Sequence, residues 1–190
     1  MLIRDATAAD ADHLVRFINM AADDLPLHFW KKSAGPGVDP MAYGRERAAR
    51  KTGSFSFRNA WLAEVDGEVA ACLLGYPAAL EPEAIDPDTP PIFVPLLELE
   101  ALAPGSWYLN VLATYPAYRG RGLGSALLAK AEAVTRQAGR TTISLIAEDT
   151  HQDALRLYRA KGFVEVARRP VVKDDWAVGA QEWILFTKSL

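Results

Sequence analysis

The chain has 190 residues, half of them hydrophobic, and a formal net charge of −3 at pH 7. This length suffices for one well-buried core, so we expect a single domain over residues 1–190. The acidic balance argues against a protein that wraps phosphate backbones, because such domains usually carry a basic excess. The single cysteine, Cys72, excludes an intramolecular disulfide and a cysteine-rich metal site.

The N-terminal segment carries acidic residues where a signal peptide needs an unbroken apolar run, and no window has the length of a membrane span. The unpaired cysteine favours a reducing compartment. We therefore expect a cytoplasmic protein that acts without a membrane and without nucleic acid.

The first elements predicted are a short strand and a helix. Thr7 and Asp10 have the spacing of a capping box, which marks a helix start. Apolar residues then recur at helical spacing and predict one buried face: Leu14, Phe17, Ile18 and Ala21. Prolines and glycines interrupt the pattern over 23–38, which predicts a loop before a second helix that begins at Asp39 and Pro40.

Residues 59–78 predict two strands joined at Asp66 and Gly67, a dipeptide that favours a tight antiparallel turn. The segment 77–104 is rich in proline and acidic residues. Proline removes ladder donors, so this segment cannot be a central strand. We expect an acidic, proline-rich insertion with one short helix over 93–101.

Regular structure resumes with a strand at 106–116, a helix over 122–137 that stops at Gly139, and a buried strand over 141–149. A helix that ends at Gly162 and two closing strands follow. The order of elements is thus β-α-α-β-β-β-α-β-α-β-β.

The stretch YRGRGLGSALL, residues 118–128, lies between a predicted strand and a predicted helix. The first N–H groups of a helix have no intrahelical partner, and with the helix dipole they favour an anion. Glycines let a phosphate approach the main chain. The residues that suit this role are Gly120, Gly122 and Gly124, with positive charge from Arg119 and Arg121. The pattern predicts a pyrophosphate loop, unless the glycines merely shape the turn.

The two common nucleotide loops have other spacings. A Walker A loop needs a lysine after its second glycine, which is absent here. A dinucleotide fingerprint that starts at Gly120 needs a glycine where Ser125 stands.

The loop resembles a known motif. RGRGLG, residues 119–124, matches the Q/R-x-x-G-x-G/A motif of the GNAT family of N-acetyltransferases. Downstream, DALRLYRAKGF, residues 153–163, is similar to the family's A-x-x-L-Y-x-x-x-G-F block. The close resemblance spans about residues 107–163. It implies an α/β fold with a mixed, mostly antiparallel sheet flanked by helices.

The resemblance implies acetyl-CoA as the acetyl donor and no metal. It places the pyrophosphate on the amides of residues 121–126 and the pantetheine arm along the strand with Leu112 and Ala113, where a main-chain N–H polarises the thioester carbonyl. His151 stands where the family often has an asparagine that holds this arm. The implied cofactor-binding residues are Leu112, Ala113, Arg119, Arg121, Gly122, Leu123, Gly124, Ser125, Ala126 and His151.

Tyr158 matches the family tyrosine that protonates the departing thiolate, and is the implied catalytic residue. The alternative is a core tyrosine whose hydroxyl bonds a backbone carbonyl. Cys72 lies within an apolar strand and is expected to be a small core residue, so a covalent acyl-cysteine is not expected.

The resemblance implies transfer to a primary amine, on a small molecule or a peptide, by direct attack in a ternary complex. Candidates for the proton acceptor lie on or beside the strands that border the cleft: Glu64, Asn110, Tyr115 and Glu148. The expected acceptor-binding residues are His28, Asn110 and Glu148. Acidic residues of the 77–104 insertion attract a cationic acceptor, or are simply solvated.

Two other functions fit the same loop. One is a CoA-binding sensor or regulatory module without catalysis, and the other is a nucleotide-binding module. The resemblance is also compatible with a homodimer.

Overall fold

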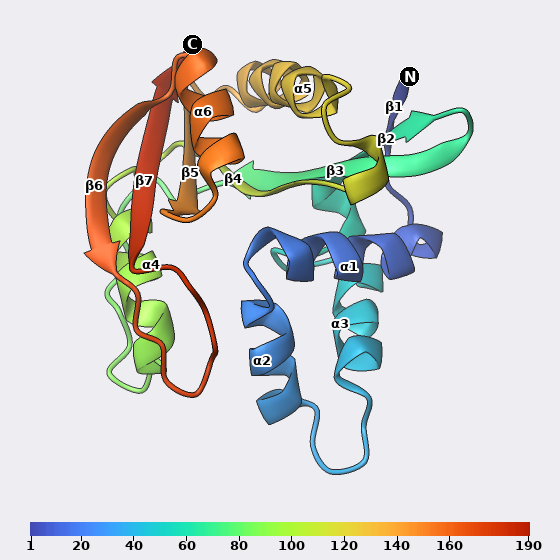
Figure 1. Ribbon diagram of the computed structural model, residues 1–190. Helices are drawn as coiled ribbons and strands as arrows, with labels where there is room; N and C mark the ends of the chain where they lie inside the picture. The colour runs from blue at the N-terminus through green and yellow to red at the C-terminus, as the bar shows by residue number, and fades with distance from the viewer. The chain divides into compact units, whose positions relative to one another are not determined.

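The structure is a computed structural model that describes residues 1–190 (Figure 1). Seven strands form a sheet in the order β1-β2-β3-β4-β5-β7-β6, accompanied by six α-helices. The predicted α/β fold with a mixed, mostly antiparallel sheet is confirmed. The chain divides into two compact units, Met1–Gly75 with Val111–Ala129, and Tyr76–Asn110 with Lys130–Leu190, called unit 1 and unit 2 below.

The strands of unit 1 are β1 (Leu2–Asp5), β2 (Ala60–Val65), most of β3 (Glu68–Pro77) and the second half of β4 (Trp107–Thr114). β1 pairs antiparallel with β2, and β2 with β3. Asp66 and Gly67, with φ of 55° and 84°, make the predicted tight turn between β2 and β3. Beyond β4, the Tyr115 N–H donates to the carbonyl oxygen of Ala70 on β3 at 2.9 Å.

Three helices belong to unit 1: α1 (Ala11–Ala21), α2 (Leu25–Ser33) and α3 (Pro40–Ala49). The predicted loop over 23–38 is wrong for its first half, which forms α2. Pro26 lies in the first turn of α2, where no N–H is needed for the helix, so it does not interrupt the helix. Asp39 caps α3 as predicted, because its carboxylate accepts hydrogen bonds from the N–H groups of Met41 and Ala42.

Gly44 allows α3 to pack closely against its neighbours. A Cβ atom at this position would lie 2.6 Å from side-chain carbons of both Trp30 on α2 and Val15 on α1. Trp30 and Val15 are themselves buried. The absence of a side chain at residue 44 therefore determines how the three helices meet.

A partly buried ion-pair cluster joins β1, β2 and the start of α1. The Arg4 guanidinium donates to both carboxylate oxygens of Asp10, at 2.8 and 2.9 Å, and to Glu64 Oε1 at 2.6 Å. Asp10 also accepts from the N–H and the hydroxyl of Thr7, at 2.7 and 2.9 Å, so the predicted capping box is present. The Arg4 side chain lowers the pKa of Asp10 to about 2.

Unit 2 contains the first half of β4, β5 (Thr142–Glu148), β6 (Val164–Pro170) and β7 (Glu182–Ser189), which lie side by side in Figure 1. β4 and β5 pair in parallel from Trp107↔Ile143 to Leu109↔Leu145, and β7 pairs antiparallel with both β5 and β6. The 77–104 segment forms no strand past Pro77 and contains one short α-helix, α4 (Val94–Glu100), as predicted. A 3₁₀ turn precedes this helix.

The strand register gives this half of the sheet two faces, and a different helix contacts each face. Side chains that share one face, called the α4 face below, are Tyr108, Asn110, Ser144, Glu148, Arg169 and Trp183. α4 packs on it, because Arg169 donates to Glu98 of α4 at 2.6 Å. The opposite face carries Phe186, whose ring lies 6.1 Å from Tyr158 of α6 (Gln152–Ala160).

The remaining helix, α5 (Leu123–Gln137), contributes residues to both units. Gly139, with a φ of 68°, ends it as predicted, and Gly162, with a φ of 84°, ends α6. None of the helices combines the length and the apolar character that crossing a membrane requires.

The Arg4–Asp10 pair yields a prediction for stability. Because the pKa of Asp10 is lowered in the folded chain, its contribution is present above its ordinary pKa of about 4 and is lost as the pH falls toward about 2. We expect Asp10→Asn to lower the free energy of unfolding by about 2 kcal/mol at pH 7. Urea unfolding of both proteins from pH 7 to pH 2 measures the difference.

The matched control is Asp12→Asn, which removes a carboxylate that pairs with Arg45 at 3.0 Å but is 64% exposed. This change should cost less than about 1 kcal/mol. A difference between wild type and Asp10→Asn that stays constant down to pH 2 would contradict the assignment.

Candidate functional site

A glycine loop connects β4 to α5 in unit 1. After the 3₁₀ turn Pro116–Tyr118, Gly120 and Gly122 have φ values of 73° and 79°, in the left-handed region that favours glycine. No atom lies within 4 Å of where a Cβ would stand at either residue. Backbone conformation, and not crowding within the chain, therefore favours glycine at both positions. Gly124 differs from the expected third turn glycine, because it lies inside α5.

The first turn of α5 directs N–H groups toward this loop. The N–H of Ala126 donates to the carbonyl of Gly122 at 3.1 Å, which makes it the first bond of the helix. The N–H groups of Leu123, Gly124 and Ser125 precede this bond and have no acceptor within the helix. The helix is 15 residues long, so its dipole adds partial positive charge at the same end.

Two arginines add full positive charge to the loop. Arg119 and Arg121 are both exposed. Arg119 Nε donates to the carbonyl of Thr114 at 3.3 Å, and Arg121 donates to the carbonyl of Ala117, also at 3.3 Å. The Arg121 guanidinium also lies 5.2 Å from the centre of the Tyr118 ring. The loop thus combines backbone donors, a helix dipole and two cations, a combination that suits an anionic ligand.

The expected pantetheine residues lie just before the loop. Leu112 is half-buried and Ala113 is buried, in the second half of β4. Their place on the strand agrees with the prediction, although their expected contacts with a donor stay a prediction.

Two candidates for the proton acceptor have other partners. Glu64 pairs with Arg4, as described above. The Tyr115 hydroxyl shares a hydrogen bond of 2.9 Å with His13 Nδ1, and its ring stacks on Phe17 at 4.2 Å. Burial raises the pKa of Tyr115, so the phenol stays protonated near neutral pH and is a weak base. Both residues thus have structural roles in unit 1.

In unit 2, Tyr158 projects from α6 into an aromatic environment. Its side chain is buried, with ring centres of Phe163 and Phe186 at 5.8 and 6.1 Å. Burial alone raises the pKa of its phenol, and the hydroxyl makes no hydrogen bond within the chain. The alternative of a core tyrosine bonded to a backbone carbonyl is therefore not what the structure has. A hydroxyl without a partner in the chain is available to a ligand.

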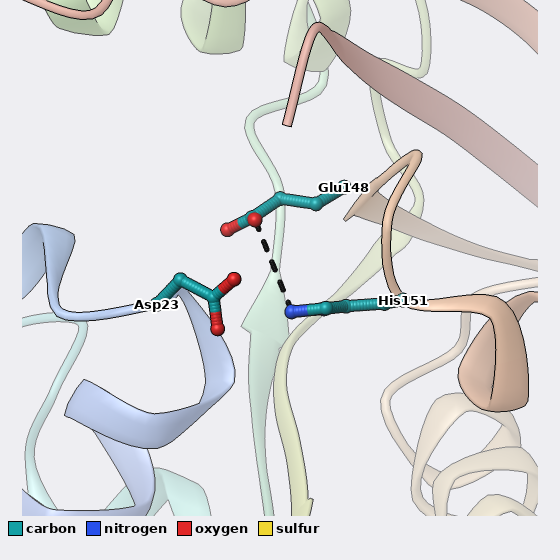
Figure 2. Close-up of side chains that lie close together, drawn as sticks. All are labelled: Asp23, Glu148 and His151. Atoms are coloured by element: carbon teal, nitrogen blue, oxygen red, sulfur yellow. Dashed lines mark ion pairs between the residues drawn. The ribbon is translucent and has the colours of Figure 1, made fainter. Parts of the chain in front are cut away.

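Glu148 and His151 meet at the end of β5, where the chain turns toward α6. His151 Nε2 lies 3.8 Å from Glu148 Oε2, and Figure 2 shows the imidazole and the carboxylate facing each other. Glu148 is buried, while His151 is half-buried. The structure therefore brings together one expected donor-binding residue and one expected acceptor-binding residue.

The other two expected acceptor-binding residues, His28 and Asn110, belong to different units. His28 lies on α2 of unit 1, and not in a loop as predicted. Asn110 lies on β4 in unit 2 and donates from Nδ2 to the Tyr76 hydroxyl at 3.0 Å. Their roles stay predictions.

A polar and aromatic cluster around Asn110 was missed from the sequence. The rings of Tyr76 and Tyr108 meet edge to face at 5.8 Å, and the Tyr108 phenol interacts electrostatically with the carboxylate of Glu100 on α4. Burial raises the pKa of Glu100. The alternation of Tyr108 and Asn110 along β4 could have indicated their shared face, but nothing in the sequence placed Glu100 or Tyr76 beside them.

Cys72 is fully buried in β3, and burial raises the pKa of its thiol far above the ordinary range. The prediction of a small core residue is confirmed. A thiol of this kind is not a nucleophile at neutral pH.

Comparison with protein families gives one match over most of the chain. Residues 25–163 match the model of the acetyltransferase (GNAT) family. This range includes the glycine loop, Glu148, His151 and Tyr158. No curated protein sequence matches the chain.

Solved structures agree in fold. An N-acetyltransferase from Staphylococcus aureus Mu50 superposes with a TM-score of 0.69 at 19% identity, over 99% of this chain and 100% of that one. A ribosomal-protein-alanine N-acetyltransferase from Brucella melitensis gives 0.62 at 21% identity, over 100% of both chains. The yncA protein of Salmonella typhimurium, solved with its cofactor acetyl-CoA, gives 0.60 at 19% identity, over 100% of this chain and 94% of that one.

Proposed function

The chain belongs to the GNAT acetyltransferase family, and from this premise we propose that it transfers an acetyl group from acetyl-CoA to a primary amine by direct attack in a ternary complex. The observation that carries the proposal is the glycine loop. It offers backbone donors at the N-terminus of α5 in the place where the family motif occurs. The acetyl-CoA bound to the Salmonella typhimurium protein of the same fold supports the choice of donor.

The donor's pyrophosphate binds the loop in this proposal. The N-H groups from Arg121 to Ser125 donate to the phosphate oxygens, while the side chains of Arg119 and Arg121 neutralise their charge. The N–H of Ala126 does not donate to the phosphate in this proposal, because it already donates to the carbonyl of Gly122. The pantetheine arm lies along Leu112 and Ala113, and His151 donates to one of its carbonyls in place of an asparagine.

The chemistry forms one C–N bond and breaks one C–S bond. The amine nitrogen attacks the thioester carbonyl carbon, and the oxyanion that develops accepts a hydrogen bond from the main-chain N–H near Ala113. The thiolate then leaves, and the proton lost by the amine balances the proton that the thiol gains. The thioester is already activated, so no covalent intermediate with the enzyme is needed. The buried Cys72 is consistent with this direct route.

Tyr158 acts on the departing sulfur in the proposal. Because burial raises the pKa of its phenol, the hydroxyl is protonated throughout the neutral range. An ordinary thiol has a pKa of about 8.5, below that of the phenol, so complete proton transfer from Tyr158 would be uphill. The hydroxyl therefore stabilises the developing thiolate chiefly as a hydrogen-bond donor.

Residues 1–190 act as one transferase domain in this proposal.

The direct test is a two-part experiment. Calorimetric titration compares acetyl-CoA with ATP and NAD, and a thiol-release assay then screens primary amines. We expect saturable binding of acetyl-CoA alone, and faster CoA release with one class of amine. Acetyl-CoA binding without acceleration by any amine would favour a CoA-binding sensor. A preference for ATP or NAD would favour a nucleotide-binding module.

Gly122→Val tests the loop. The new side chain would stand where the phosphate approaches the backbone, and the left-handed conformation strains any residue with a Cβ. We expect the Kd for acetyl-CoA to rise at least about 10-fold, equivalent to about 1.4 kcal/mol. Gly139→Val at the other end of α5 is the matched control, since Gly139 has a similar φ and equally open surroundings. Equal affinities for the two variants would contradict the loop assignment.

Tyr158→Phe tests the leaving-group role. The hydroxyl has no partner in the folded chain, so its removal should leave the Tm unchanged or slightly raised. We expect kcat to fall by about 10²-fold, with little change in the KM for acetyl-CoA. Steady-state kinetics and thermal unfolding measure both effects. Unchanged turnover would show that the thiolate is stabilised elsewhere.

A further inference from the structure

Glu100 is a half-buried carboxylate without a cationic partner. It is the last residue of α4, within the acidic, proline-rich segment. Its carboxylate interacts electrostatically with the Tyr108 phenol, and no lysine or arginine forms an ion pair with it. Glu98, on the same helix, instead has Arg169 at 2.6 Å. Carboxylates removed from water are usually paired with a cation, so Glu100 is unusual in this chain.

The surroundings of Glu100 suit a cation. The Tyr108 phenol interacts with this carboxylate, and the Tyr76 ring meets the Tyr108 ring edge to face at 5.8 Å. Aromatic faces attract ammonium groups electrostatically. Asn110 donates its amide N–H to Tyr76 and keeps its carbonyl oxygen as an acceptor. The cluster thus offers negative charge, oxygen acceptors and aromatic rings, which together match the three N–H donors of an ammonium.

The cluster can also be reached from solvent. Tyr76, Glu100 and Asn110 are each half-buried, while Tyr108 is buried beneath them. A ligand group can therefore contact the exposed parts of these three side chains.

We propose that Tyr76, Glu100, Tyr108 and Asn110 form a binding site for the cationic amino group of the acceptor, with Glu100 as its counter-ion. This inference rests on the proposed function and narrows the acceptor to amines that are protonated in solution. A bound ammonium that is itself acetylated first releases one proton to water, so that its nitrogen has the lone pair that attacks the thioester. The inference also gives a role to the proline-rich segment, because this segment carries Glu100 on its one α-helix.

The test measures amine binding directly, so that it does not depend on turnover. Three probes are titrated calorimetrically: 1,4-diaminobutane, 2-phenylethylamine and a tripeptide with a central lysine. Neutral 1,4-butanediol serves as the uncharged analogue of the first. The variant Glu100→Gln keeps the shape and an acceptor for Tyr108 but removes the charge. Glu98→Gln removes one charge from the same helix and is the matched control.

We expect at least one cationic probe to bind the wild type, and 1,4-butanediol not to bind. Glu100→Gln should weaken that binding about 10- to 100-fold, the range expected for one charge-assisted hydrogen bond. Glu98→Gln should change it less than twofold. Equal weakening of probe binding by both variants would show that the effect comes from general surface charge, and would overturn the site.

Acetyl-CoA titrated into the same three proteins separates this inference from the proposed function. All three should bind acetyl-CoA alike. If the wild type binds acetyl-CoA but none of the cationic probes, or if Glu100→Gln binds the probes as the wild type does, the site is overturned and the transferase proposal stands. If the wild type does not bind acetyl-CoA, the transferase proposal fails and this inference fails with it.

Discussion

The unsatisfied N–H groups at the start of α5 are the constraint on which the account depends. A helix leaves its first donors without acceptors, and here the chain enters the helix through two left-handed glycines that keep side chains away from those donors. The preceding strand, β4, fixes where the loop begins. Arg119 donates a hydrogen bond to the carbonyl of Thr114 at the end of β4, and Arg121 donates one to the carbonyl of Ala117 within the loop. Backbone geometry, rather than a particular side chain, is therefore what makes this loop suited to an anion.

Positive and negative charges lie in different parts of the chain, and each part suits one of the two proposed substrates. The chain is acidic overall, yet its glycine loop carries two exposed arginines beside the positive end of a helix. Conversely, Glu100 belongs to an acidic segment and has aromatic neighbours in place of a counter-ion. One part of the chain is thus suited to an anionic donor and another to a cationic acceptor. Net charge alone would have concealed this division, because the 21 basic and 24 acidic residues of the whole chain largely cancel.

Local signals in the sequence predicted most of the fold. The Asp66-Gly67 turn, the Thr7 and Asp10 capping box and the helix stop at Gly139 each depend on neighbouring residues, and all three are present. The helix α2 departs from the predicted loop because Pro26 lies in a first turn, where proline is compatible with a helix. Whether a proline starts or interrupts a helix depends on where the helix begins, which the surrounding packing of Leu25 and Trp30 decides.

The candidate site was predictable to the extent that it lies in continuous motifs. The glycine loop and Tyr158 each belong to such a motif, whereas Glu100 and Tyr108 come together through the register of β4 and the packing of α4. The pairing of Glu148 with His151 likewise depends on the turn after β5. Contacts of this kind leave no periodic pattern in the sequence, so only the folded chain shows them.

The central claim is that the backbone amides at the start of α5 hold the donor's pyrophosphate. Amide NMR spectra of the ¹⁵N-labelled protein, recorded as acetyl-CoA is added, test it residue by residue. The account predicts that the largest shifts fall on the N–H groups of Leu123, Gly124 and Ser125, that Gly139 is unaffected, and that inorganic pyrophosphate at higher concentration shifts the same amides. Saturable binding that leaves these three signals unmoved would contradict it.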